Sequence, residues 1–343
     1  MRKPSQVTLK DIAKRLDVSK VTVSKALRDH PDIAPDTKAR IKELAKELDY
    51  TPNYIARRLS AKKSNTIGVV VPKIAHAFFA SVIEAIYDTA FANNFEIILT
   101  VSQEIAEREI EHIKTLLSMR VGGLLVSLSE QTKDTAIFEM VKKKNVPLVF
   151  FDRVIEGLDF STVTADDRGG AVLAVEQAIR AGYTKIAHLA GFSHLNIGRE
   201  RCAGFHEAMQ KHNLPIKPEW VIEGGLSEEY GYKGLMQWYN NQDLPEAIFT
   251  VTFPVALGAY EAAKEVGLKI PQDFDLICFG DSSICRFLSP PLTCIEQPTD
   301  SLGKKAVELL IEEMNRLELT NPQQIVLETS LKIRQTCVCR SSS

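Results

Sequence analysis

The feature that most constrains the fold is a regular alternation of short apolar runs with amphipathic segments, which begins at Ile67 and continues almost to the last residue. Short apolar runs separated by segments of helical periodicity predict parallel strands joined by helices. Because the alternation restarts after Asp166, we expect an α/β core of two doubly wound parallel-sheet lobes. Ligands of such folds bind beyond the carboxyl ends of the strands, which here means between the lobes.

The boundaries of the expected elements follow from the ends of each periodic stretch. Strands are expected at residues 67–71, 95–101, 123–128, 147–151, 186–190, 221–224, 247–250, 276–279, 325–327 and 331–334. Helices are expected at residues 78–93, 108–119, 135–145, 169–181, 199–212, 228–239, 254–266 and 300–317.

The first 50 residues show helical periodicity without strands. Thr8, followed three residues later by Asp11, predicts a capping box that starts a helix at residues 9–16. After a brief connection, Ser19 offers its hydroxyl as the N-cap of a second helix. A third helix, from Pro35 to about Leu48, closes a small apolar core. The residues expected in that core are Ile12, Leu16, Val23, Leu27, Ile41, Leu44, Ala45 and Leu48.

The second of these helices has a polar outer face, opposite Val23 and Leu27. The outer face carries Lys20, Val21, Ser24, Lys25 and Arg28. Two short helices, a tight turn and a basic, hydroxylated outer face predict a helix-turn-helix that reads the major groove of DNA. A small amphipathic hairpin inside a larger core would show the same pattern, so the rest of the chain must decide between the two.

Charge is distributed unevenly along the chain. Residues 1–63 carry 16 Lys and Arg against 8 Asp and Glu, a net charge of +8. The other 280 residues carry 26 against 36, a net charge of -10, which gives -2 for the whole chain. A small basic head on a large acidic body suits binding to a polyanion by one end, and a basic helix-turn-helix favours DNA as that polyanion.

Length and composition bound the remaining possibilities. A chain of 343 residues is expected to form two or three domains. No segment approaches the ~20 apolar residues that a membrane span needs, and the N-terminus lacks the apolar stretch of a signal peptide. The six cysteines, at positions 202, 278, 285, 294, 337 and 339, include no C-x-x-C pair. We therefore expect a cytoplasmic protein with reduced thiols and no membrane segment.

An enzyme is the main alternative, because doubly wound sheets host many activities. The chain contains no G-x-G-x-x-G, G-x-x-x-x-G-K, G-x-S-x-G or H-E-x-x-H motif. Asp166 and Asp167 are adjacent, which favours capping of the next helix over acid–base chemistry. His206 and His212 are six residues apart, so they do not share one helical face as metal ligands would. We expect no catalytic residue, no metal ligand and no cofactor.

Several ordered motifs in the chain resemble the LacI/GalR family of bacterial transcription regulators. The head and the segment after it read VTLKDIAKRLDVSKVTVSKAL and YTPNYIARRL, and the core contains IGVVVP, VPLVFFDR, RERCAGF, ALGAY and PPLTCIEQP. The resemblance implies a dimeric, effector-controlled repressor that binds a pseudo-palindromic double-stranded operator. A free sugar-binding protein is a further alternative to a transcription regulator. It fits poorly, because the basic head is attached and a signal peptide is missing.

The resemblance also implies the domain organisation. A helix-turn-helix head would occupy residues 1–50, a hinge helix and linker residues 51–64, and a core of the periplasmic-binding-protein type residues 65–343. Within the core, the N-lobe would comprise residues 65–163 and 295–325, and the C-lobe residues 164–293 and 326–340. The chain would cross between the lobes near residues 162–165, 292–297 and 325–327.

The resemblance places particular residues on DNA. Lys20, Val21 and Lys25 would face base edges, because lysine donates to guanine and valine suits a thymine methyl. Leu59 would enter the minor groove as an apolar wedge, although it can instead pack on the core. The family usually has arginine at the position of Lys25, so the bidentate contact to guanine is weakened. The full set expected on DNA is Thr8, Ser19, Lys20, Val21, Thr22, Ser24, Lys25, Arg28, Asn53, Ala56, Arg57 and Leu59, with Thr22, Ser24 and Asn53 near phosphates.

An effector cleft is also implied. Its expected residues are Pro72, His76, Phe78 and Phe79 after the first strand, Asp152 and Arg153 after the fourth, and Arg201, Phe253 and Asp281 in the second lobe. Sugar-binding members of the family typically have an Asn-Asp pair at positions 252 and 253 and an Asp at position 280. Here Thr252, Phe253 and Gly280 stand there, which is similar to the fructose repressor branch, whose effectors are sugar phosphates.

We expect a sugar or sugar phosphate as the effector. This departure favours the sugar phosphate over a neutral sugar, because Arg201 would anchor its anion without a competing aspartate. The alternatives are that Arg201 braces the lobe through a salt bridge and that Asp152 caps a turn.

Overall fold

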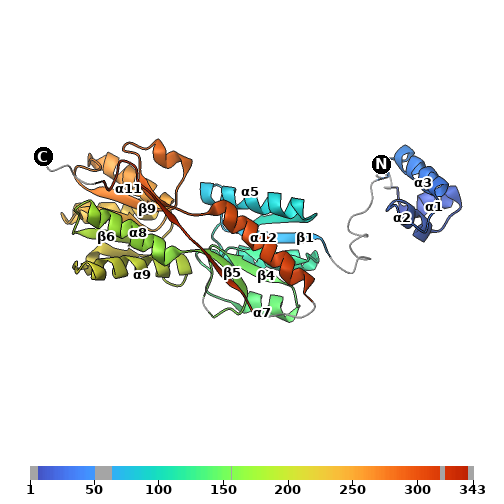
Figure 1. Cartoon of the computed structure of the whole chain (residues 1–343), viewed down its shortest axis with the longest axis horizontal. Helices are drawn as coiled ribbons and strands as arrows, with labels where there is room; N and C mark the ends of the chain where they lie inside the picture. Colours follow the sequence, from blue (N-terminus) through green and yellow to red (C-terminus); the bar gives the residue numbers. More distant parts are fainter. Residues whose placement is uncertain (1–6, 51–63, 156, 317–320, 339–343) are drawn as a thin grey trace. The chain divides into compact units, whose positions relative to one another are not determined.

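The computed structural model describes residues 7–50, 64–155, 157–316 and 321–338 (Figure 1). The chain divides into two compact units between Ser64 and Asn65, and the described residues of each unit form an apolar core of their own. Within these described ranges, no helix is long and apolar enough to cross a membrane.

The first unit contains the helices α1 (Leu9–Leu16), α2 (Lys20–Ala26) and α3 (Pro35–Glu47). The predicted capping box is present, because the Asp11 carboxylate accepts hydrogen bonds from the backbone N–H and the hydroxyl of Thr8 at 2.8 and 2.7 Å. Asp17 ends α1 in the left-handed conformation, with φ of 51°. The predicted core residues all belong to one apolar cluster, in which Ile12, Val23 and Ile41 are fully buried.

The second unit contains two six-stranded sheets, one in each lobe. The N-lobe sheet consists of β1 (Thr66–Val71), β2 (Glu96–Val101), β3 (Gly123–Val126), β4 (Leu148–Phe151), β5 (Ser161–Ala165) and β11 (Gln324–Leu327). All its strands are parallel, in the order β11-β5-β4-β3-β1-β2. Its helices are α5 (Ala77–Ala92), α6 (Ala106–Ser118), α7 (Ala136–Lys143) and α12 (Thr299–Asn315). Helices α5 and α12 pack side by side (Figure 1).

The C-lobe sheet consists of β6 (Ile186–Ala190), β7 (Val221–Glu223), β8 (Ala247–Thr250), β9 (Asp275–Phe279), β10 (Thr293–Glu296) and β12 (Ser330–Lys332). Their order is β12-β10-β9-β8-β6-β7. The helices of this lobe are α8 (Asp167–Arg180), α9 (Asn196–Lys211), α10 (Glu228–Asn240) and α11 (Phe253–Val266), with single 3-10 turns at η1 (Pro218–Trp220) and η2 (Ser283–Arg286). The two doubly wound lobes expected from the alternation are confirmed.

The described chain passes between the lobes after β5, after β10 and after β11. Helix α8 packs on β9 and β10 of the C-lobe, and α12 packs on β3, β4 and β5 of the N-lobe. The strands β5 and β10 occupy segments that the alternation leaves outside the predicted strands. Strand β5 mixes Ser and Thr with apolar residues, and β10 is four residues long and closely follows two prolines, so neither gives a long apolar run.

One strand departs from the expected parallel arrangement, because β12 runs antiparallel to β10. The preceding strand β11 is parallel to β5 and ends at the edge that faces the other lobe. Only Glu328 and Thr329 separate β11 from β12. The chain therefore enters the C-lobe at the edge where the other strands of that sheet end, and it must run in the opposite direction.

Candidate functional site

The outer face of α2 carries the residue types expected on a DNA-reading helix. The Ser19 hydroxyl accepts a hydrogen bond from the backbone N–H of Thr22 at 3.0 Å, so Ser19 is the N-cap, as predicted. Its oxygen also lies 2.8 Å from the Thr22 hydroxyl. Val21 is 64% exposed, while Val23 and Ala26 are buried in the head core. An apolar side chain held in solvent by a packed helix is suited to contact with a thymine methyl.

Hydrogen bonds within the head restrain other side chains of α2. The Lys25 ammonium donates to the Asp32 carboxylate at 2.7 Å, so Lys25 must exchange Asp32 for DNA before it reaches a base. Arg28 donates to the carbonyl oxygen and the hydroxyl of Ser24, at 3.0 and 3.2 Å. Lys20 is exposed and makes no ion pair with another residue that the structure describes. Lys20 and Val21 are therefore the side chains that can reach a base without first breaking such a contact.

The remaining residues expected on DNA divide into two groups. The hydroxyl of Thr8 donates to Asp11 and takes part in the cap of α1. Asn53, Ala56, Arg57 and Leu59 lie outside the described residues.

A cavity of about 290 Å³ lies at the carboxyl ends of β1, β4, β8, β9 and β10, between the two lobes. The predicted effector residues that line it are His76, Phe78, Phe79, Asp152, Arg153, Arg201, Phe253 and Asp281. Pro72 does not line the cavity. It is buried directly after β1, and the cavity wall begins only at Ala75, at the end of the turn that leads into α5.

The cavity is also lined by residues that the strand and helix pattern did not identify as ligand contacts. Glu228 stands at the start of α10 and Gln297 directly follows β10. A residue just beyond a parallel strand is a general signal for a ligand contact, but β10 was not among the predicted strands. The additional lining residues are Ala75, Ala77, Ile197, Leu226, Glu228, Thr252, Pro254, Leu257, Phe279, Gly280, Ser282, Ile284 and Gln297.

Arg201 is held by a buried salt bridge. This agrees with the alternative stated in the sequence analysis, in which Arg201 braces the lobe. Its Nε and Nη2 donate to one oxygen of Asp167 at 2.9 and 2.7 Å, and its Nη1 donates to the Val251 carbonyl at 2.6 Å. The guanidinium carbon lies 3.6 Å from the centre of the Phe279 ring. Arg201 is 2% exposed and Asp167 is 4% exposed. The expectation that the arginine meets a ligand anion without a competing aspartate is therefore wrong.

Arg153 is paired in the same way on the N-lobe side. Its Nη1 donates to the two carboxylate oxygens of Glu104 at 3.0 and 2.9 Å. The buried Nε has no hydrogen-bond acceptor among the described residues and lies 3.8 Å from an Asp152 oxygen. Burial raises the pKa of Asp152 to about 7, although Arg153 and Arg201 oppose the shift. No described residue donates a hydrogen bond to the Asp152 carboxylate, so it does not cap a turn there.

The opposite wall contains a third ion pair. One oxygen of Asp281 accepts a hydrogen bond from Arg334 at 2.6 Å, while the other is buried without a donor among the described residues. Burial and the positive charges of Lys73 and Arg153 lower the pKa of His76, which disfavours the charged form of its imidazole. The cavity thus combines aromatic walls with paired, nearly balanced charges.

Comparison with known proteins covers both units of the chain. Residues 8–53 match the model for bacterial regulatory proteins of the lacI family, and residues 175–337 match a periplasmic binding protein-like domain. The HTH-type transcriptional repressor PurR of Actinobacillus pleuropneumoniae serotype 3 (strain JL03) is 31% identical over 331 residues, which are 96% of this chain and 98% of that protein. PurR of Haemophilus influenzae (strain PittEE) is 33% identical over 309 residues, 90% of this chain and 91% of that protein.

Two solved structures extend the comparison. The Lac repressor dimer bound to operator and the anti-inducer ONPF is 27% identical, with a TM-score of 0.84 over 97% of this chain and 100% of that chain. The transcriptional regulator CelR–cellobiose complex is 25% identical, with a TM-score of 0.74 over 96% of this chain and 100% of that chain.

Proposed function

The chain belongs to the lacI family of bacterial regulatory proteins, and from this we propose how it reads its operator and which class of effector it binds. It is a DNA-binding transcriptional repressor regulated by a small-molecule effector, and it is not an enzyme. It acts as a homodimer on a pseudo-palindromic operator, because a two-fold dimer presents its reading helices to two half-sites. The similar Lac repressor structure, a dimer bound to operator, supports this assembly.

The observation that carries the DNA-reading proposal is the exposure of Val21 beside Lys20 on a helix whose other face is packed. Val21 contacts a thymine methyl, and Lys20 and Lys25 donate to guanine acceptors in the major groove. Thr22, Ser24 and Asn53 contact phosphates and fix the register of the head. Arg57 adds charge to the phosphate contacts and Leu59 enters the minor groove, as the family resemblance implies.

The effector is a small, uncharged, polyhydroxylated molecule of the sugar class. A sugar hydroxyl both donates and accepts, so it can bond to carboxylates such as Asp152 and Asp281 and to N–H groups of Arg153. Arg201 and Arg153 each already have a carboxylate partner, so a phosphate would bring its charge into a site with no surplus cation. A cavity of about 290 Å³ suits a small ligand of this size, and cellobiose in the similar CelR complex supports the sugar class.

Calorimetry with matched neutral and phosphorylated sugars tests the effector class, with and without operator selected from random DNA by the full-length protein. We expect a neutral sugar to bind and to change operator affinity by the same factor by which operator changes sugar affinity. Phe253→Ala should abolish this response, while Tyr239→Ala, on the exposed face of α10, should leave it unchanged. Tight binding of only the phosphorylated sugar would overturn the uncharged-ligand proposal.

The same selected operator tests the reading face. Lys20→Ala should weaken the specific complex, whereas Lys46→Ala removes an equal charge from exposed surface of α3 and should have little effect. Equal losses in the two variants would show that only total charge matters and would reject direct reading by Lys20.

A further inference from the structure

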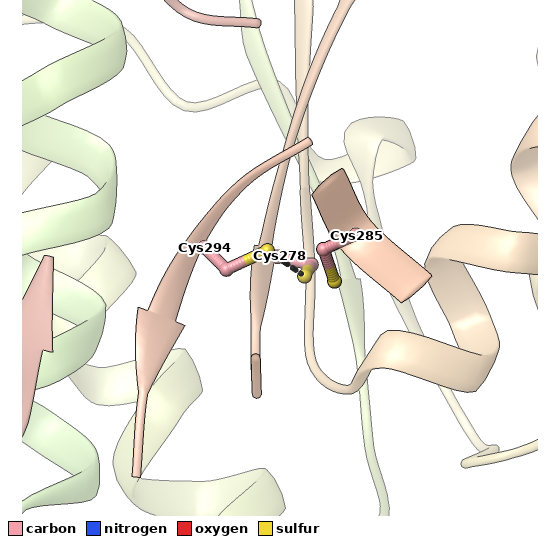
Figure 2. Close-up of side chains that lie close together, drawn as sticks. All are labelled: Cys278, Cys285 and Cys294. Atoms are coloured by element: carbon pink, nitrogen blue, oxygen red, sulfur yellow. Dashed lines mark hydrogen bonds between the residues drawn. The ribbon is translucent and has the colours of Figure 1, made fainter. Parts of the chain in front are cut away.

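Three cysteines from separate positions in the sequence converge inside the C-lobe. Cys278 lies on β9, Cys294 on the neighbouring strand β10, and Cys285 on the single turn η2 (Figure 2). Cys278 and Cys294 are directly paired in the parallel sheet, so their side chains leave the same face. All three side chains are fully buried, and their sulfur atoms lie within 4.8 Å of one another.

The geometry of the cluster is close to that of a thiolate metal site. The sulfur atoms of Cys278 and Cys294 are 3.3 Å apart, well beyond the ~2.05 Å of a disulfide bond. Sulfur atoms bound to one zinc ion at ~2.3 Å lie roughly 3.8–4.0 Å apart. The measured separation is shorter than this value and no sulfur–sulfur separation in the cluster exceeds 4.8 Å, so an ion at the centre requires only small side-chain movements. Figure 2 shows the three sulfur atoms gathered between the two strands and the turn.

Simple packing of small apolar side chains explains buried cysteines in general, but it does not require their sulfur atoms to meet. Cys202 and Cys337 are also free thiols, and they do not join the cluster. Local spacing could not predict the convergence, because the three positions are brought together by the register of two strands and by the turn between them.

We propose that Cys278, Cys285 and Cys294 form a binding site for a soft, thiophilic d¹⁰ metal ion, of the class of Zn²⁺ and Cu⁺. Thiolate ligands select this class over Mg²⁺ or Ca²⁺, which prefer oxygen ligands. Binding replaces thiol protons by sulfur–metal bonds, and the released protons pass to solvent. No change of oxidation state is involved.

The turn η2 provides both the entry path and a connection to the effector cavity. Ile284 is 49% exposed and Phe287 is 79% exposed, so outward movement of this turn opens the cluster to solvent. The backbone N–H of Cys285 donates to the carbonyl of Ser282, which lines the cavity together with Asp281 and Ile284. An ion that ties Cys285 to β9 and β10 therefore fixes this cavity wall. The consequence for effector binding rests on the proposed function, whereas the metal site itself does not.

The test uses full-length, reduced, metal-free protein with Zn²⁺ as the first probe and Cu⁺ as the second. Native mass spectrometry should show one ion per chain, and competition with a chromogenic chelator should give its affinity. Cys285→Ala should weaken binding by more than about 100-fold, because loss of a ligand exceeds the 10–100-fold cost of losing an outer-shell partner. Cys202→Ala, which removes a thiol outside the cluster, should bind as the wild type does.

A direct measurement on the wild-type protein makes the test independent of whether Cys285→Ala folds. Cd²⁺ or Co²⁺ should produce a sulfur-to-metal charge-transfer band whose intensity corresponds to three thiolates. Absence of a retained ion and of this band under reducing conditions would overturn the proposal. An ion that binds equally well to Cys285→Ala would place the metal elsewhere in the chain and would overturn it too. Because the readout needs neither operator nor effector, its failure would leave the repressor function untouched.

Discussion

Replacement of Arg201 by alanine should destabilise the core strongly, because it leaves the buried Asp167 without its cation. The two side chains are 2% and 4% exposed, and two N–H groups of the arginine bond to one carboxylate oxygen. Removing one partner of a buried ion pair costs about 3–5 kcal/mol. At ~2–4 °C per kcal/mol for a domain of 150–250 residues, the melting temperature should fall by roughly 6–20 °C. A matched surface change, Arg168→Ala, breaks an exposed pair with Glu207 and should cost only about 0–1 kcal/mol.

The loss of stability in Arg201→Ala should depend on pH in a defined direction. Burial raises the pKa of Asp167, and the charge and hydrogen bonds of Arg201 oppose that rise. Without Arg201 the pKa of Asp167 in the folded state rises further above its value in the unfolded chain. The folded state then binds a proton more tightly, so stability falls as pH increases from the unfolded pKa towards the folded one. Arg201→Ala should consequently be less destabilised at pH 5 than at pH 8.

Urea unfolding at both pH values measures these differences, and a paired variant separates charge from packing. Asp167→Leu combined with Arg201→Met removes both charges and should recover much of the stability lost in Arg201→Ala. Two results would refute an uncompensated Asp167 as the cause. One is a melting temperature for Arg201→Ala within 2 °C of the wild type at pH 8, a threshold taken from the lower end of ~2–4 °C per kcal/mol. The other is a loss of stability that does not change between the two pH values.

The remaining predictions concern Asp152 and the head. Because the pKa of Asp152 is raised to about 7, against ~3.9 in an unfolded chain, stability should fall as pH rises between these values, and Asp152→Asn should remove that slope in urea unfolding. Val21→Ala should cost operator binding about 1–2 kcal/mol, at ~0.8 kcal/mol per lost methyl, and should relax the preference for one thymine in a gel-shift series. Asp32→Ala frees Lys25 and should tighten operator binding by no more than about fivefold, since exposed pairs contribute about 0–1 kcal/mol. Specific operator affinity should fall by about 10³–10⁵ between 50 and 200 mM salt if ~6–10 phosphates are contacted, and a flat response would contradict phosphate contacts by the head.

The head could be predicted closely because its signals are local. Thr8 and Asp11 are three residues apart, and Ser19 stands directly before α2, so each cap can be identified from neighbouring residues alone. The strands of the core could be predicted for a related reason. Most of them are buried on both faces and give short apolar runs, such as Thr66–Val71, in which every residue is buried. The less apolar strands Ser161–Ala165 and Thr293–Glu296 gave no such run, and there local periodicity failed.

The pairing of charges around the cavity could not be predicted in this way. Arg201 and Asp167 are 34 residues apart, and Arg153 and Glu104 are 49 residues apart. Each pair joins elements whose relative placement is decided by strand order and helix packing, and periodicity within one element carries no information about it. Aspartate at position 167 looks from the sequence like a helix cap, but its neighbour Asp166 provides the cap by accepting a hydrogen bond from Gly169. The side chain of Asp167 is thereby left for the arginine.

Hydrogen bonds of Asn196, beside these pairs, connect the two lobes at the cavity. Asn196 in the C-lobe donates to the backbone carbonyl of Asp152 at 2.9 Å and accepts from the N–H of Val154 at 2.9 Å, both in the N-lobe. Its amide nitrogen also lies 3.2 Å from Asp167, the partner of Arg201. A ligand that contacts Asp152 on one side and Arg201 on the other therefore meets both ends of one hydrogen-bonded network that spans the lobes. A ligand can shift a conformational equilibrium only through differential contacts in the two states. We therefore propose that effector binding acts on the arrangement of the lobes through this network.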